Sequence, residues 1–308
     1  MSEIRVGALA DERILYGPFH ERRRLLERIG AAGLDHVFVA DHISFRSGFG
    51  MDGLVQAAIA AAMHPTLAVQ IGVYLLALRH PVAVARQLST LCASAPGRIV
   101  LGVGVGGEDR HEIEICGVDP ATRGRRTDDC LAALRALLSG DACDFAGEFF
   151  AFERARIVPA PDPPLRIAIG GRSDAALRRA ARFGDGWLAA WCSPRRFAAA
   201  VEQIREQAER AGRTSVAWRH GLQVWAGFDT DRERARQRLA ARMHEMYGIP
   251  FQPFERYSPY GSPAEVAEFL APYLAAGCAD INLMGVAASS EATVDAIAEV
   301  RERLLGRP

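Results

Sequence analysis

Short runs of strand-forming residues alternate with longer runs of helical pattern along the whole chain. Short apolar runs predict buried strands, and apolar residues at helical spacing predict helices that cover them. Strands are expected over residues 4–9, 36–40, 67–74, 99–104, 167–170, 186–189, 217–227 and 280–284. Helices are expected over residues 18–31, 53–62, 81–93, 124–138, 175–183, 194–211, 232–246, 264–276 and 291–305.

Eight strand–helix alternations without a break in composition predict one α/β domain, residues 1–308, with the architecture of a (β/α)8 TIM barrel. Two segments interrupt the alternation. Residues 143–165 contain phenylalanines around Gly147 and then a proline-rich stretch, which predicts a hairpin insertion before the fifth strand. Residues 247–262 are rich in tyrosine, phenylalanine and proline and predict a second ordered insertion.

The composition excludes several classes of protein. Of the 308 residues 49% are hydrophobic and the formal net charge is zero, so charge gives no reason to expect binding to nucleic acid or a membrane surface. The chain has no lysine, which excludes lysine as a Schiff base or general base. Six cysteines without a C-x-x-C pair, no leader, no long apolar run and no metal-ligand spacing predict a cytoplasmic enzyme without a metal.

Chemistry in a barrel lies at the C-terminal ends of the strands, and four of these ends carry unusual residues. The second strand ends in Asp41 and His42, a carboxylate beside an imidazole that could act as general acid and base or bind a cofactor. A loop-forming aspartate and an ordinary surface histidine are the alternative. An isolated Gly72 before Val73 in the third strand indicates either tight packing at a bulge or a backbone step beneath a planar ring.

The fourth strand runs into glycines, and Gly102, Gly104 and Gly107 spell the G-x-G-x-x-G fingerprint of dinucleotide-binding folds. That fingerprint follows the first strand and opens directly into a helix, whereas these glycines follow the fourth strand and precede the charged residues 108–112. A backbone cradle for a ligand is therefore preferred over a dinucleotide loop or a flexible turn. The expected cradle consists of Gly104, Val105, Gly106 and Gly107.

The loop after the fifth strand has the chemistry of a phosphate site. It consists of Gly170, Gly171, Arg172 and Ser173. A guanidinium and a hydroxyl stand directly before a helix, whose free N–H groups and positive dipole end attract anions. Ser173 as a plain helix N-cap is the alternative.

Six segments together resemble the bacterial luciferase-like flavin and deazaflavin oxidoreductases. They are LDHVFVADH (34–42), IGVYLLALRHP (71–81), RIVLGVGVGGE (98–108), RGRRTDDCLAALRALL (123–138), IAIGGRSDAALRRAARFGDGW (167–187) and GSPAEVAEFL (261–270). The resemblance implies a TIM barrel with insertions, often dimeric, that binds FMN or coenzyme F(420) at the strand ends. It also implies that the Gly72–Val73 peptide is cis behind the cofactor ring, that residues 104–107 line the cofactor and that residues 170–173 hold its phosphate.

The pair Asp41-His42 favours F(420), because flavin-dependent members tend to have Glu-His-His there and deazaflavin enzymes Asp-His. We expect a homodimeric F(420)-dependent oxidoreductase that moves a hydride between the deazaflavin and a small organic substrate. His42 would exchange the proton, supported by Asp41, with Glu108 as a further candidate acid. The substrate pocket is expected to include Phe45, Tyr74 and Trp191.

Two other functions stay open. One is a monooxygenase that uses reduced FMN and oxygen, and the other is a protein that binds flavin without turnover. A glucose-6-phosphate dehydrogenase is disfavoured, because the chain has no lysine to hold a sugar phosphate.

Overall fold

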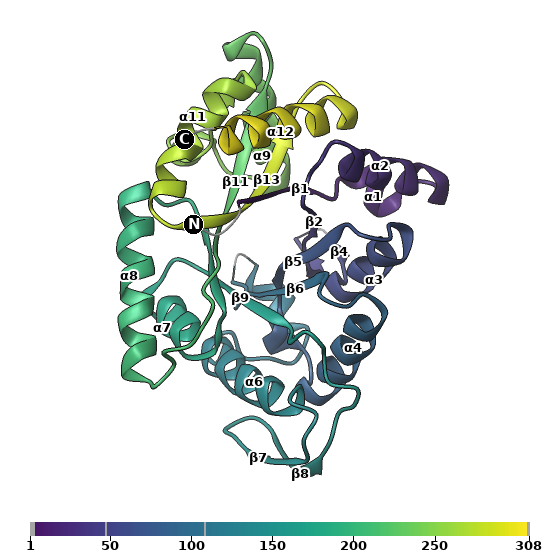
Figure 1. Ribbon diagram of the computed structural model, residues 1–308, viewed down its shortest axis with the longest axis vertical. Helices are drawn as coiled ribbons and strands as arrows, with labels where there is room; N and C mark the ends of the chain where they lie inside the picture. Colours follow the sequence, from purple (N-terminus) through teal and green to yellow (C-terminus); the bar gives the residue numbers. More distant parts are fainter. Residues whose placement is uncertain (1–3, 47, 108, 307–308) are drawn as a thin grey trace. The chain divides into compact units, whose positions relative to one another are not determined.

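The computed structural model describes residues 4–46, 48–107 and 109–306, and the chain divides into two compact units. Unit 1 comprises residues 1–38, 187–206 and 217–308. Unit 2 comprises residues 39–186 and 207–216. Figure 1 labels the helices and strands along the chain.

A parallel sheet forms the centre of unit 1. Its strands are β1 (Arg5–Leu9), β2 (His36–Val39), β10 (Gly186–Ala190), β11 (His220–Phe228), β12 (Tyr260–Gly261) and β13 (Cys278–Val286). β1 pairs with β2 and β13, while β11 pairs with β10, β12 and β13. The helices that begin in this unit are α1 (Glu12–Tyr16), α2 (Phe19–Ala31), α8 (Pro194–Arg210), α9 (Arg232–Tyr247), α10 (Gln252–Glu255), α11 (Pro263–Ala275) and α12 (Ser290–Leu305).

Unit 2 contains a second set of parallel strands. These are β5 (Ala68–Tyr74), β6 (Ile99–Val103) and β9 (Arg166–Gly170), with β6 between the other two. The helices of this unit are α3 (Gly53–Met63), η1 (Leu76–Leu78, a single 3₁₀ turn), α4 (Pro81–Ser94), α5 (Arg110–Glu114), α6 (Arg123–Leu137) and α7 (Asp174–Phe183). Two antiparallel hairpins complete it, β3 (His42–Phe45) with β4 (Phe49–Met51) and β7 (Cys143–Ala146) with β8 (Ala151–Ala155).

The predicted alternation is present. All eight expected strands and nine expected helices occur, with ends that differ by a few residues. The segment expected to form a hairpin insertion contains the hairpin β7–β8, which lies beside α6 (Figure 1). The segment 247–262 contains α10 and β12. The sequence did not predict the β3–β4 hairpin or α5, because each is too short to show a periodic pattern.

Candidate functional site

Three neighbouring strands of unit 2 deliver the segments that follow them to one edge of the sheet. β5, β6 and β9 are parallel, with Tyr74 opposite Val103 and Val103 opposite Ile169. The chain after β5, residues 104–107 after β6 and residues 171–173 after β9 therefore leave from the same edge. Ligands of α/β proteins bind at this carboxyl edge, so we take it as the candidate site.

The side chain of Val73 packs against three glycines. A Cβ atom added to Gly104 would lie 2.3 Å from Val73 Cγ2, and one added to Gly170 or Gly102 would lie 2.9 or 3.3 Å from Val73 Cγ1. The Gly72–Val73 peptide is cis, as the resemblance implied, and the pairing with β6 is irregular there. Gly104 and Gly170 are thus required because the Val73 side chain fills the space of theirs, whereas a Cβ atom on Gly102 would meet the backbone oxygen of Ile71 at 2.2 Å.

Asp41 is buried, and both its carboxylate oxygens accept hydrogen bonds. Arg79 Nη1 lies 2.6 Å from Oδ2 and Nη2 lies 2.8 Å from Oδ1. The backbone N–H groups of Leu75 and Gly53 donate at 2.8 and 2.9 Å. Burial raises the pKa of the Asp41 carboxyl, and the hydrogen bonds and charge of Arg79 oppose the rise. Asp41 directly precedes His42. Its hydrogen bond with Leu75 therefore connects the backbone next to His42 with the chain that follows the Val73 bulge.

His42 is held by a different carboxylate. Its Nδ1 lies 3.1 Å from Oε2 of Glu112 on α5, and its ring packs against Phe45 with centroids 4.3 Å apart. The expectation that Asp41 supports His42 is wrong. Consecutive residues of an extended chain point to opposite sides, so Asp41 enters the core while His42 begins β3. Within residues 4–46, 48–107 and 109–306, the other ring nitrogen of His42, Nε2, has no hydrogen-bond partner.

The glycine run after β6 has a backbone conformation that favours glycine. Gly106 and Gly107 have φ of 66° and 120°. A Cβ atom on Gly107 would lie 3.2 Å from Nε and Nη2 of Arg123, so a guanidinium stands beside this residue. Val105 is half-buried. Glu108, the further candidate acid, lies outside the described residues.

The loop expected to hold a phosphate is exposed from Gly171 to Ser173. Gly171 has φ of 118°, and the Ser173 hydroxyl accepts a hydrogen bond from Ala176 N at 3.3 Å. Ser173 is therefore the N-cap of α7, the alternative that the sequence left open. The loop still precedes the positive end of a helix dipole, and phosphate binding there stays a prediction.

Two residues expected in the substrate pocket are buried in unit 2. Phe45 lies against the His42 ring. The ring of Tyr74 lies beneath Arg79, whose Cζ is 4.2 Å from the ring centroid. Burial raises the pKa of the Tyr74 hydroxyl. Phe45 thus contacts the candidate catalytic histidine, whereas Tyr74 stabilises the arginine that binds Asp41.

Trp191, the third expected pocket residue, belongs to an aromatic cluster in unit 1. It follows β10, and its ring lies 4.8 Å from Phe254 and 5.7 Å from Tyr247 between centroids. Its φ of 47° is left-handed, which is uncommon for a residue other than glycine and is often found at functional sites. The hydroxyl of Tyr247 also accepts a hydrogen bond from Trp225 Nε1 at 3.2 Å. The predicted second insertion therefore packs against the end of a strand.

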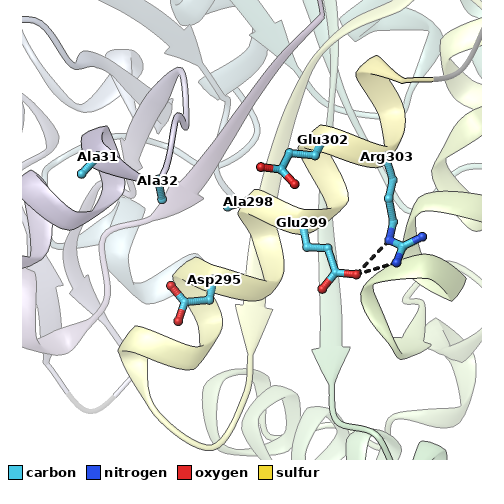
Figure 2. A pocket seen from close by; sticks show the side chains of 7 residues that line it. All are labelled: Ala31, Ala32, Asp295, Ala298, Glu299, Glu302 and Arg303. Carbon is cyan, nitrogen blue, oxygen red and sulfur yellow. Dashed lines mark hydrogen bonds and ion pairs between the residues drawn. The ribbon is translucent and has the colours of Figure 1, made fainter.

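A shallow pocket in unit 1 does not involve any of these residues. It lies between the end of α2 and α12 (Figure 2) and is lined by Ala31, Ala32, Asp295, Ala298, Glu299, Glu302 and Arg303. Arg28 pairs with Asp295 at 2.6 Å, and Arg303 pairs with Glu299 at 2.7 Å. These pairs stabilise the surface of the helices, and we assign the pocket no role.

The fold and the site can now be compared with known proteins. The family model described as luciferase-like monooxygenase matches residues 3–304. The chain belongs to this family. The predicted family is confirmed. No helix in the described part of the chain is long and apolar enough to span a membrane.

Two curated proteins are similar to part of the chain. It is 38% identical over 156 residues to the uncharacterized protein Rv0940c of Mycobacterium tuberculosis, covering 51% of this chain and 53% of that protein. It is 32% identical over 213 residues to the F(420)-dependent glucose-6-phosphate dehydrogenase of Nakamurella multipartita, covering 67% of this chain and 62% of that enzyme. The chain thus matches only about half to two thirds of the length of these relatives.

Solved structures show the fold. An F(420)-dependent secondary alcohol dehydrogenase in complex with an F(420)–acetone adduct matches with a TM-score of 0.82 and 18% identity, over 98% of this chain and 99% of that one. The monooxygenase RslO1 from Streptomyces bottropensis matches with a TM-score of 0.81 and 20% identity, over the same shares. The predicted luciferase-like (β/α)8 barrel is confirmed.

Sequence reasoning missed two residues of the site. Glu112 lay in a charged string without helical periodicity, although Asp109 three residues before it forms an N-cap–x–x–Glu signal that could have indicated α5. Arg79 lay in a segment that carries the family resemblance, but no pattern in the sequence linked it to Asp41.

Proposed function

We propose that this protein is an F(420)-dependent oxidoreductase that acts on a small organic substrate. One observation supports the proposal above all: a hydrogen bond holds the segment of His42 next to the segment of Val73. Asp41, directly before His42, accepts this bond from the N–H of Leu75, two residues beyond Val73. A proton-exchanging imidazole and a backbone step suited to a planar ring thus share one hydrogen-bonded anchor. Relatives named as F(420)-dependent dehydrogenases favour a deazaflavin at this edge.

The residues at the edge fit the parts of such a cofactor. Gly72 and Val73 would lie behind the ring, with no side chain on the neighbouring glycines to obstruct it. The strand-end segment of Gly104, Val105, Gly106 and Gly107 would line the ring and its chain. The cofactor phosphate would bind to Gly170, Gly171, Arg172 and Ser173, of which the last three are exposed, at the N-terminus of α7.

The chemistry divides between cofactor and protein. When bound, F(420) supplies the site that accepts or gives up a hydride. His42 takes up or releases the proton that accompanies the hydride at the substrate oxygen. Phe45 fixes the His42 ring by stacking on it. We propose Phe45 and Tyr74 as residues of the substrate pocket, and a role of Trp191 in substrate binding stays a prediction.

We propose a neutral substrate with apolar parts rather than a sugar phosphate. The chain has no lysine. Two arginines of α9 are paired: Arg236 with Glu255 at 2.7 Å, and Arg238 with Asp229 at 2.7 Å. A paired guanidinium is a poor site for a second anion, because binding one would break the existing pair.

Titration of the purified protein with F(420) and with FMN tests the proposal. We expect F(420) to bind at micromolar concentration or below and FMN to bind much more weakly. Tight FMN binding without F(420) binding would instead support the reduced-FMN monooxygenase, which the likeness to RslO1 keeps as the second candidate. The third candidate, a flavin-binding protein without turnover, predicts that His42→Ala leaves any measured hydride transfer unchanged. Homodimerisation and a cytoplasmic location stay predictions.

A further inference from the structure

Glu112 connects the candidate catalytic histidine to the loop around it. Its side chain is 4% exposed. Oε1 accepts the backbone N–H groups of Ile43 and Ser44 at 2.7 and 3.1 Å, and the His42 Nδ1 lies 3.2 Å from Oε1 and 3.1 Å from Oε2. A carboxylate surrounded by donors accepts from all of them, which requires the hydrogen of the imidazole to be on Nδ1.

We propose that Glu112 is the positioning residue of His42, which fixes the ring orientation and holds the neutral imidazole in its Nδ1–H tautomer. The lone pair of Nε2 is then the one available to the reaction. The catalytic consequence rests on the proposed function, whereas the tautomer does not. No other side chain in the described ranges hydrogen-bonds His42.

The proton balance follows from this tautomer. For an alcohol substrate, Nε2 of His42 would take the hydroxyl proton, and bound F(420) would supply the hydride acceptor that the conversion to a carbonyl product needs. The imidazolium that forms is stabilised by the carboxylate on Nδ1 and then releases the Nε2 proton to water. In the reverse direction the imidazolium supplies the proton to the carbonyl oxygen.

Asp109 provides a matched control. It is the N-cap of α5, three residues before Glu112. Like Glu112 it bonds the β3–β4 hairpin, because its Oδ2 accepts the N–H of Arg46 at 2.7 Å. It does not contact His42. Loss of its charge therefore perturbs the hairpin in the same way as loss of the Glu112 charge, without the effect on the imidazole.

Glu112→Gln makes the sharper test. The amide oxygen can keep the hydrogen bonds from Ile43 and Ser44, while its NH₂ group replaces Oε2 and donates to His42 Nδ1. The amide oxygen stays 3.2 Å from Nδ1 as a competing acceptor, but the NH₂ group at 3.1 Å bonds only an unprotonated Nδ1, so the variant should increase the share of the Nε2–H tautomer. The wrong tautomer should lower kcat by about 10²–10³-fold with a KM change below about threefold.

The experiment is ¹⁵N NMR of the imidazole nitrogens in purified wild type, Glu112→Gln and Asp109→Asn, at a pH where the ring is neutral. We expect Nδ1–H in the wild type and in Asp109→Asn, and a larger share of Nε2–H in Glu112→Gln. Predominant Nε2–H in the wild type overturns the proposal even if the variant does not fold, and so does an unchanged tautomer in Glu112→Gln. If the tautomers behave as expected but the wild type turns over nothing with F(420), the proposed function fails and the positioning role stands.

Discussion

Arg79 and Asp41 form a two-pronged ion pair in the interior of unit 2, with Nη1–Oδ2 and Nη2–Oδ1 distances of 2.6 and 2.8 Å. The pair lies between the first residue of α3 and the chain that follows the Val73 bulge, because Asp41 also accepts hydrogen bonds from the N–H groups of Gly53 and Leu75. Arg79 covers the ring of Tyr74 as well. The backbone after the bulge is thus held by an ion pair whose two residues, Asp41 and Arg79, both lie outside β5.

Removing the arginine should therefore cost much stability. Arg79→Met leaves the Asp41 carboxyl buried without its cation, and we expect a loss of about 3–5 kcal/mol in the free energy of unfolding, measured by urea denaturation. Asp52→Asn is the control, since Asp52 Oδ2 also pairs with Arg79 at 3.1 Å but its side chain is 40% exposed. Asparagine preserves the N-cap of α3, so the control should lose less than about 1 kcal/mol. Equal losses in both variants would contradict the role assigned to the buried pair.

The local sequence was sufficient to predict the longer strands and helices and the glycine-containing segments of the candidate site. Gly72-Val73, residues 104–107 and residues 170–173 each stand out because glycines interrupt an apolar strand. The reason for the glycines was not visible, since Val73 meets Gly104 and Gly170 only after β5, β6 and β9 have paired. The sequence of one strand does not show which side chain from another strand will pack against its glycines.

The partners of the two site residues Asp41 and His42 could not be predicted either. Arg79 is 38 residues from Asp41, and Glu112 is 70 residues from His42. Sequence adjacency suggested that Asp41 would hold His42, but adjacent side chains in extended backbone point apart. Contacts over such separations depend on the tertiary fold, whereas helix caps and strand periodicity depend on neighbouring residues.

A glycine substitution tests the packing of Val73. Gly104→Ala places a Cβ atom 2.3 Å from Val73 Cγ2, and we expect it to cost about 1–3 kcal/mol of unfolding free energy through overpacking. Adding Val73→Ala should recover most of this loss, so the two changes should couple favourably in a double-mutant cycle. Gly102→Ala is the control, because its Cβ atom would lie 2.2 Å from the backbone oxygen of Ile71. Rescue of both glycine variants by Val73→Ala, or of neither, would show that the valine is not what excludes the side chain.

The hydrogen bond between Trp225 and Tyr247 is expected to stabilise the aromatic cluster of unit 1. Tyr247→Phe keeps the ring but leaves the buried Trp225 N–H without this acceptor, which should cost about 1–3 kcal/mol. Urea unfolding followed by tryptophan fluorescence measures the loss. Tyr260→Phe removes a half-buried hydroxyl that donates to Glu255 at 2.9 Å and should cost less. A smaller loss for Tyr247→Phe than for Tyr260→Phe would contradict this assignment.

A buried histidine should make the stability of the protein depend on pH. Burial lowers the pKa of His220 from 6.5 to about 4, and its Nδ1 accepts the backbone N–H of Trp187 at 3.2 Å. Above pH 6.5 the ring is neutral in both the folded and the unfolded state, so it adds no pH dependence there. Between pH 6.5 and 4 the unfolded chain binds a proton that the folded chain does not, so stability falls as the pH falls.

The size of the effect follows from the shift, and a single substitution isolates it. The wild type should lose about 3 kcal/mol relative to His220→Asn between pH 6.5 and 4, because asparagine can accept the same N–H without titrating. His36, whose pKa burial also lowers, contributes equally to both proteins and cancels in the difference. Urea unfolding at several pH values gives this difference directly. A difference that stays constant across the range would mean that His220 is protonated in the folded protein as readily as in the unfolded chain.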